Sequence, residues 1–200
     1  MNIIICRADE LVDKVAKLKP AAVLSIEGPE ARPDDASYAP RLKDVLPHSA
    51  ASDTPQMILK FFDYPEENGP GGPDIEQVEA GLAFIMERIT KGDVIIHCTL
   101  GKSRSAAIAL GVLSQLHPHA TEAELLEKLL AIRPIAAPNI IVVGMVDELT
   151  GRGGRLVKAV LDHPGLTAAR EAAIASRAEY IKKHPIRINP PQNKPKNNAP

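Results

Sequence analysis

The sequence predicts an α/β domain with a mainly parallel central sheet of about four to five strands, flanked by helices and followed by a C-terminal helical extension. Short apolar runs rich in Val and Ile alternate with helical patterns over residues 1–150, which is typical of parallel sheets. A chain of 200 residues with 44% hydrophobic and 24% charged residues can bury one core but is short for two. We therefore expect one domain with appendages.

The first two predicted strands lie close together in the sequence. Residues 2–6 form a short apolar run, and a helical pattern follows over residues 9–19 until Pro20 stops it. Residues 21–26 form the second strand, which breaks at Glu27-Gly28-Pro29.

A long proline-rich segment follows the second strand. Residues 29–55 contain five prolines among small polar residues, so we expect a surface loop with at most one helical turn. Loops of this length are uncommon inside compact domains and are often functional. The segment therefore is a candidate border of a binding cleft.

Two more strands enclose a well-supported helix. Residues 56–62 read as the third strand, and Asp63 follows it on a loop. From Asp74 to Gly92 apolar residues recur at three- and four-residue spacing, which predicts the crossover helix to a fourth strand over residues 93–97.

Helical patterns dominate the second half of the chain. The run after Arg104 is apolar on nearly every face, which suits a helix buried at the centre of the domain. Thr121 and Glu124 form a capping box that starts the next helix. Residues 139–149 combine a strand-like composition with a helix-like length, and we predict a helix there.

The C-terminal part is predicted to be an appendage. A Gly-rich hinge at residues 151–154 precedes a short helical stretch to Leu161 and a longer helix from about Thr167 to Lys183. We expect residues 1–150 to form the main domain, 151–184 to pack on it as a helical extension, and 185–200 to be a disordered tail.

Charge and cysteine content exclude several function classes. A formal net charge of −1 gives no overall attraction to nucleic acid or to an anionic membrane. The two cysteines, Cys6 and Cys98, indicate a reducing compartment rather than a disulfide framework. Without a signal-peptide pattern at its start or a long apolar run, the chain is expected to be cytoplasmic.

The stretch from Val94 to Ser105 carries the chemistry. A β-branched strand ends at Cys98, and five residues later Arg104 opens the buried helix. A helix N-terminus presents unpaired backbone N–H groups and the positive end of the helix dipole, so this loop is an anion site. The same field stabilises a cysteine thiolate, which is the nucleophilic form.

The pattern His97-Cys98-x5-Arg104-Ser105, with Gly101 and Ser103 inside it, resembles the signature loop of the cysteine-based protein tyrosine phosphatases. It is most similar to the small dual-specificity phosphatases and their bacterial relatives. This resemblance implies a phosphatase-like domain and a hydrolase that acts on phosphotyrosine or a related monoester. No cofactor or metal is implied.

The chemistry of phosphate-monoester hydrolysis assigns roles to these residues. Cys98 attacks phosphorus, and Arg104 grips two phosphate oxygens with its planar guanidinium. By resemblance, Ser105 hydrogen-bonds the Cys98 sulfur as it leaves, and His97 braces the loop from behind. The remaining oxygens are held by loop N–H groups, which we assign to Thr99, Leu100, Gly101, Lys102, Ser103 and Arg104.

The leaving group also needs a proton, which must come from another loop. The family places an aspartate some 30 residues before the cysteine, and Asp63 fits both that position and its place after a strand. Its rivals are Asp74, which also reads as a helix N-cap, and Glu66 or Glu67, which also read as solvated loop charges.

Three further residues each allow two interpretations. Asn139 resembles a family Pro-Asn element that supports the signature loop, and it also fits a plain N-cap. Lys102 either favours highly phosphorylated substrates or is solvated. Cys6 is either a partner for a reversible disulfide with Cys98 or a small buried hydrophobe, and we favour the second.

The leading hypothesis is a phosphatase that acts on a phosphorylated protein or small phosphorylated substrate, without nucleic-acid or membrane partners. A second is a phosphate-binding module with weak or no turnover, which recognises a phosphorylated partner. A third, a rhodanese-like sulfur transferase, fits Gly101 and the Arg104-Ser105 pair less well. The sequence does not name the substrate.

Overall fold

The computed structural model describes residues 2–36, 38–46, 53–65 and 67–183. Its centre is one four-stranded sheet in which every neighbouring pair of strands is parallel, in the order β1-β4-β2-β3. The strands are β1 (Ile3–Arg7), β2 (Ala22–Glu27), β3 (Gln56–Lys60) and β4 (Val94–Cys98). The predicted fold class is confirmed. The third strand ends two residues earlier than predicted, at Lys60.

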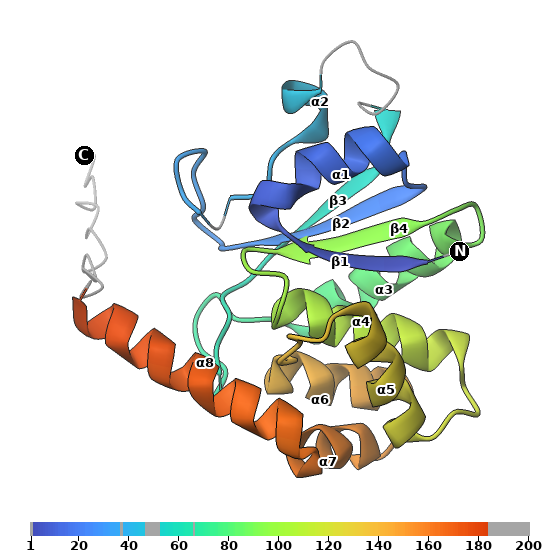
Figure 1. The fold of residues 1–200 in the computed structure, drawn as a ribbon, viewed down its shortest axis with the longest axis vertical. Coiled ribbons are helices and arrows are strands. Elements are labelled where there is room, and N and C mark those ends of the chain that lie inside the picture. The colour runs from blue at the N-terminus through green and yellow to red at the C-terminus, as the bar shows by residue number, and fades with distance from the viewer. Residues whose placement is uncertain (1, 37, 47–52, 66, 184–200) are drawn as a thin grey trace, which may run out of the picture.

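Helices cover both faces of this sheet, as Figure 1 shows. One face carries α1 (Leu11–Leu18), which follows a 3-10 turn at Ala8–Glu10, and the single helical turn α2 (Leu42–Val45). A small apolar cluster fills the space beneath them: Cys6, Leu11, Val15, Val23, Leu42 and Ile95. We call this the α1/α2 face.

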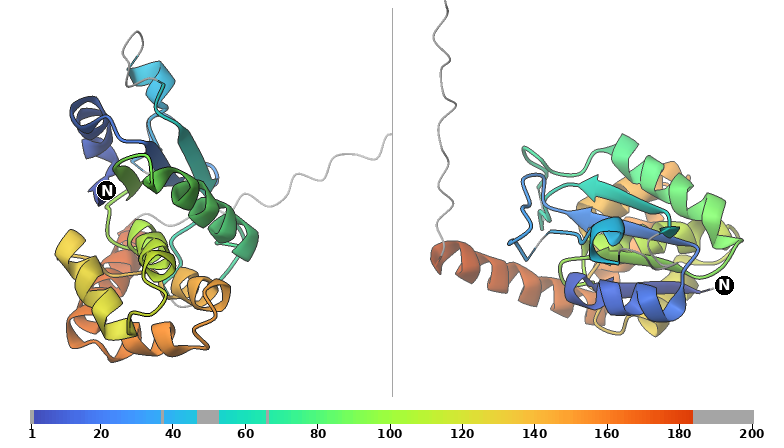
Figure 2. Two further views of the ribbon diagram at one scale, coloured as in Figure 1. Left: turned by 90° about the vertical axis from the view of Figure 1, so that its right-hand side faces the viewer. Right: turned by 90° about the horizontal axis from the view of Figure 1, so that it is seen from above.

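The opposite face holds the larger core, and the views in Figure 2 show its helices stacked away from the sheet. Here α3 (Ile75–Ile89) and α4 (Arg104–Leu116) contact the strands, and α5 (Glu122–Ile132) and α6 (Ile140–Leu149) pack on α4. Residues 104–114 of α4 are all buried, as its apolar sequence predicts. At Gly111 a Cβ atom would lie 2.7 Å from the Leu82 side chain of α3, so a larger residue there would force neighbouring side chains to shift.

Three local predictions are confirmed at helix starts. Thr121 and Glu124 form the predicted capping box of α5. Asp74 accepts a hydrogen bond from the backbone N–H of Gln77 and is the N-cap of α3. The ambiguous segment 139–149 is helical, with Asn139 as its N-cap.

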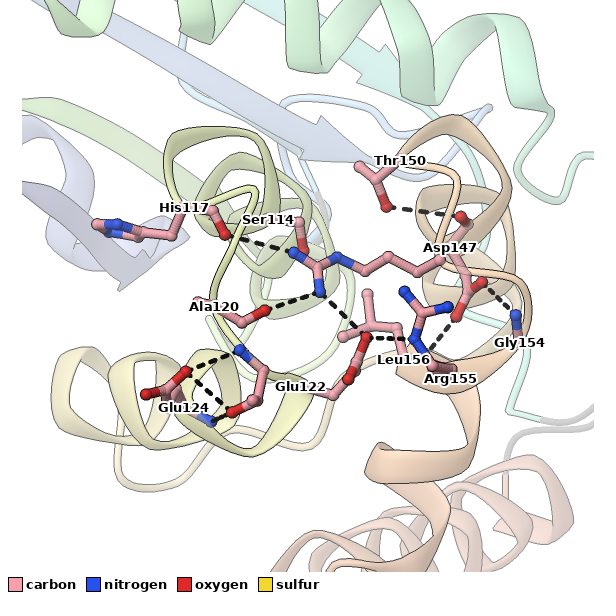
Figure 3. Close-up of polar contacts among 12 residues, drawn as sticks. Ser114, His117, Ala120, Glu122, Glu124, Asp147, Thr150, Gly154, Arg155 and Leu156 are labelled. Atoms are coloured by element: carbon pink, nitrogen blue, oxygen red, sulfur yellow. Dashed lines mark hydrogen bonds and ion pairs between the residues drawn. The ribbon is translucent and has the colours of Figure 1, made fainter.

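The Gly-rich segment 151–154 is anchored by side chains, which corrects its description as a hinge. Arg152 is buried and donates to the carbonyls of His117 and Ala120 and to the carboxylate of Glu122. The buried carboxylate of Asp147 accepts from Gly154 and from other backbone N–H groups at the start of α7 (Arg155–Asp162), as Figure 3 shows. These bonds fix α7 against α5 and α6.

The last described helix is α8 (Pro164–Lys183), which projects beyond α7 (Figure 1). It begins three residues before the predicted Thr167, because proline at the first helical position needs no N–H partner and its φ angle already suits a helix. The predicted tail at residues 185–200 lies outside the described residues. Over the described part of the chain, none of the helices is both long and apolar enough to cross a membrane.

The segment after β2 is held down at two points. Glu27, fully buried at the end of β2, forms a bidentate ion pair with Arg41 and accepts from the backbone N–H of Ala39. Gln56 bonds the backbone of Leu42 and Pro40. The helical turn that the sequence allowed within residues 29–55 is α2.

Candidate active site

The parallel sheet places the ends of β3 and β4 at one edge, where ligands bind in folds of this kind. Cys98, the last residue of β4, is 2% exposed, and its sulfur lies 3.2 Å from the hydroxyl oxygen of Ser105. Arg104 opens α4 and is also buried. The structure therefore brings together the cysteine, the arginine and the serine of the signature loop.

The loop between Cys98 and α4 turns its carbonyl groups outward. Because a trans peptide directs C=O and N–H in opposite directions, the N–H groups of residues 100–104 point into the loop. Such a ring of N–H groups at a helix N-terminus is a cradle for a tetrahedral anion. The accepting carbonyls, with the donor to each, are Thr99 (Ala8 N), Leu100 and Gly101 (Arg133 side chain), Lys102 (Ala137 N) and Ser103 (Asn139 N and Ala107 N).

Arg133 is a supporting residue that the sequence analysis did not assign. Its Nε donates to the Gly101 carbonyl at 2.9 Å and its Nη2 to the Leu100 carbonyl at 3.3 Å. Arg133 caps the C-terminus of α5, 32 residues beyond the loop that it holds. One feature of the sequence could have pointed to Arg133 as a support of the loop: the Arg133-Pro134 pair lies just before the predicted Asn139 element.

Gly101 is required by geometry at the tightest point of the loop. Its φ angle is +61°, and a Cβ atom there would lie 2.4 Å from the carbonyl oxygen of Cys6. No side chain fits that distance, because the obstacle is backbone of the neighbouring strand β1. This supports the curled loop expected from the sequence.

Two of the three guanidinium nitrogens of Arg104 donate hydrogen bonds to described residues, and the third does not. Its Nη1 donates to the Phe61 carbonyl at 2.9 Å, and its Nη2 donates to the Thr99 hydroxyl at 3.0 Å. Its Nε has no hydrogen-bond partner among the described residues, and Asp63 Oδ2, at 3.8 Å, is beyond hydrogen-bond distance. A buried guanidinium N–H without an acceptor is costly unless a ligand supplies one.

Asp63 lies against the signature loop, as the acid prediction requires. Its Oδ1 accepts from the Ser103 hydroxyl and from the Asn139 amide, both at 2.7 Å. The rival Asp74 caps α3 instead. Glu67 is exposed, and Glu66 lies outside the described residues.

Asn139 is the N-cap of α6, and its side chain also bonds the loop after β3 rather than the signature loop, which only its backbone N–H contacts. Its Oδ1 accepts from the backbone N–H groups of Ile141 and Val142, which caps α6. Its Nδ2 donates to Asp63 and to the Tyr64 carbonyl. One side chain thus links the start of α6 to the loop after β3.

His97 is buried behind the cradle, on the α1/α2 face. Its Nε2 lies 2.7 Å from the hydroxyl oxygen of Ser25 on β2. Burial is the main cause that lowers the pKa of His97, to about 4, and Arg104 lowers it further while the Cys98 backbone and Glu27 raise it. The ring is therefore neutral at ordinary pH.

Cys6 is a buried hydrophobe rather than a redox partner. It belongs to the apolar cluster of the α1/α2 face, whereas Cys98 belongs to the core on the opposite face. Both thiols are free, and burial raises the pKa of Cys6 to about 12. Lys102 is exposed on the loop. This exposure fits both interpretations of Lys102, an ion pair with a second phosphate group of a substrate and a solvated side chain.

Comparison with known proteins adds information on the fold. No protein-family model and no curated protein sequence matches the chain. Among solved structures, DUSP15 is 19% identical, with a TM-score of 0.54 over 82% of this chain and 94% of its own. Human DUSP28 is 16% identical, with a TM-score of 0.53 over 75% and 92%. PTPMT1 is 17% identical, with a TM-score of 0.56 over 79% and 92%.

These neighbours are phosphatases of the dual-specificity group, and the match spans nearly their whole length. At such low identity the likeness concerns the fold. Together with the parallel sheet and the signature loop, it shows that this chain has the fold of the cysteine-based protein tyrosine phosphatases, of the dual-specificity type.

Proposed function

We propose that the protein is a cysteine-dependent phosphatase that hydrolyses phosphotyrosine or a related phosphate monoester. The observation that carries this proposal is the buried Nε of Arg104, which has no hydrogen-bond partner among the described residues, together with a loop whose carbonyls are bonded outward, so that the N–H groups of residues 100–104 are available to an anion. These donors can provide hydrogen bonds and positive charge to the three equatorial oxygens of a phosphoryl group that Cys98 attacks.

The first chemical step is a displacement at phosphorus. The Cys98 thiolate forms the S–P bond as the bond between phosphorus and the leaving oxygen breaks, and that oxygen takes the bonding electrons. Asp63 supplies a proton to the leaving oxygen, so the product departs as an alcohol or phenol. Arg104 and the loop N–H groups hold the equatorial oxygens throughout.

The second step hydrolyses the phosphocysteine. Water attacks phosphorus, Asp63 takes a proton from it, and the S–P electrons return to sulfur. The Ser105 hydroxyl, 3.2 Å from that sulfur, is placed to donate to the thiolate as it leaves. Phosphate and the starting enzyme result, and the protein residues supply all the groups in this scheme.

The proposed substrate is a phosphorylated protein or a small phosphorylated molecule. We also propose that residues 1–150 are the catalytic domain and that residues 151–184 are its helical extension. Two free thiols, one of them the nucleophile, suit a reducing compartment such as the cytoplasm.

Hydrolysis of 4-nitrophenyl phosphate in the presence of a metal chelator tests the proposal. The wild type is expected to release nitrophenolate, and Cys98→Ser is expected to release none above background. Cys6→Ala is the matched control, because it removes the other thiol on the opposite face of the sheet. Tight binding of a phosphopeptide without any hydrolysis would instead favour the phosphate-binding module.

A further inference from the structure

A series of hydrogen bonds, part-buried at Gln56 and buried at His97, runs from the segment after β2 to the back of the cradle. Gln56 Oε1 accepts from the backbone N–H of Leu42 at 3.0 Å, and Gln56 Nε2 donates to the Pro40 carbonyl at 2.8 Å. The same Nε2 donates to Ser25 Oγ at 2.8 Å, which in turn lies 2.7 Å from His97 Nε2. We call the side chains of Gln56, Ser25 and His97 the relay.

The number of available hydrogens fixes the direction of each bond in the relay. Both Nε2 hydrogens of Gln56 are used, so Ser25 Oγ is an acceptor towards Gln56. The Ser25 hydroxyl hydrogen has one described acceptor, His97 Nε2, and Ser25 is fully buried. If His97 Nε2 carried a proton, that hydroxyl hydrogen would have no acceptor among the described residues, whereas a proton on Nδ1 lies close enough to the Cys98 backbone to raise the pKa of the ring.

The relay therefore places the ring proton of neutral His97 on Nδ1. Within the described residues Nδ1 makes no hydrogen bond of good geometry, although the Cys98 backbone is close enough to raise the pKa of the ring. An N–H dipole beside the Cys98 backbone adds to the positive field of the cradle. The opposite tautomer would present a lone pair there.

We propose that Ser25 and Gln56 are positioning residues, which hold His97 as the Nδ1–H tautomer and so favour the thiolate of Cys98. The effect of these residues on catalysis rests on the proposed phosphatase function. The position of the ring proton of His97 does not depend on that function. The sequence analysis assigned neither residue. Both lie on strands other than β4: the register of the sheet places Ser25 opposite His97, and Gln56 acts on the ring only through Ser25.

A purely structural role is the competing explanation. The buried Ser25 and the half-buried Gln56 also tie β2 and β3 to the segment at residues 38–46, and their loss would lower stability without changing the imidazole. The charged groups that act on the ring are Glu27 and Arg104, and on the cradle side Asp63 contacts Arg104 and Ser103 while Lys102 is exposed on the loop itself. All four stay unchanged in the variants below.

Nitrogen-15 NMR of histidine-labelled protein tests the tautomer directly. The signal of His97, assigned by its loss in His97→Gln, is expected to show a protonated Nδ1 and an unprotonated Nε2 in the wild type. Ser25→Ala is expected to give a mixture or the other tautomer, and Ser25→Thr, which keeps the hydroxyl, is expected to restore the wild-type pattern. Ser114→Ala is the matched control, because it removes a buried hydroxyl bonded to a carbonyl within α4.

The rate of Cys98 alkylation by iodoacetamide at pH 6, read by peptide mass, measures the consequence without any turnover. We expect Ser25→Ala to slow this rate about threefold or more, Gln56→Met to slow it less because Ser25 can still donate, and Ser114→Ala to leave it unchanged. Cys6 does not interfere, since burial raises its pKa to about 12.

The outcomes separate this inference from the proposed function. A wild-type His97 protonated on Nε2 would overturn the inference. An unchanged tautomer and an unchanged alkylation rate in folded Ser25→Ala would also overturn it. If Ser25→Ala does not fold, an unchanged alkylation rate in Gln56→Met would do the same. Absence of phosphatase activity with the expected tautomer and rates would refute the proposed function and leave the relay standing.

Discussion

Asn139 donates its side-chain amide to Asp63 Oδ1 at 2.7 Å, across 76 residues of sequence. The same side chain caps α6 through its oxygen. A change at Asn139 therefore affects two properties that can be measured apart, the position of the proposed acid and the stability of a helix.

Asn139→Asp is expected to keep the cap and remove the donor to Asp63. Turnover of 4-nitrophenyl phosphate should fall about tenfold or more, and the free energy of unfolding should fall by about 1–3 kcal/mol, because a second carboxylate then faces Asp63 and the Tyr64 carbonyl where the amide donated. Asn139→Ala should lose turnover and also about 1 kcal/mol of stability, measured by urea unfolding. Equal turnover in Asn139→Asp and wild type would show that Asp63 needs no such support.

Asp63→Asn is expected to reduce kcat by about 10²–10⁴-fold for an alkyl phosphate, whose leaving group needs a proton. The loss should be smaller for 4-nitrophenyl phosphate, because nitrophenolate leaves readily without one. Asp74→Asn is the control: it changes a helix cap and should leave both rates near the wild-type values. A large rate loss in Asp74→Asn alone would move the acid to that residue.

Gly101→Ala is expected to abolish turnover, because its Cβ would meet the Cys6 carbonyl at 2.4 Å and displace the loop. Gly153→Ala is a matched control with the same φ of +61° and nothing within 4 Å of the added carbon. It should cost about 1–2 kcal/mol in urea unfolding and leave kcat unchanged. Full activity in Gly101→Ala would mean that the loop tolerates a different path.

The stability of the protein is expected to fall between pH 6.5 and pH 4. Burial lowers the pKa of His97 to about 4, so the unfolded chain takes up this proton first as the pH falls. The loss reaches about 3 kcal/mol at pH 4 relative to pH 7. Urea unfolding across this range should show a flatter dependence for His97→Gln, and an equally steep one would assign the effect to other groups.

Local signals predicted the fold well because each is carried by neighbouring residues. The capping box at Thr121 and the apolar run after Arg104 need no knowledge of the rest of the chain. The helix α8 begins three residues before the predicted Thr167, because Pro164 occupies its first helical position. Arg152 was read as part of a hinge because its three partners come from residues 117–122.

The residues of the candidate site also fall into two groups, those predicted from neighbouring sequence and those that only the fold brings together. The cradle is contiguous in sequence, and its pattern is specific, so its residues could be assigned directly. Arg133, Ser25 and Gln56 act across strands and helices, and their residue types are common at solvated or structural positions. Only the register of the parallel sheet and the path of the chain after α5 bring them to the loop.

Trapping of the covalent intermediate tests the central claim most directly. Wild-type protein mixed with excess 4-nitrophenyl phosphate and quenched within milliseconds is digested, and the peptide that contains Cys98 is weighed by mass spectrometry. We expect one added phosphoryl group on Cys98, which is transient in time and absent from Cys98→Ser. Hydrolysis with no phosphoryl group on Cys98 at any time, or unchanged hydrolysis by Cys98→Ser, would contradict it.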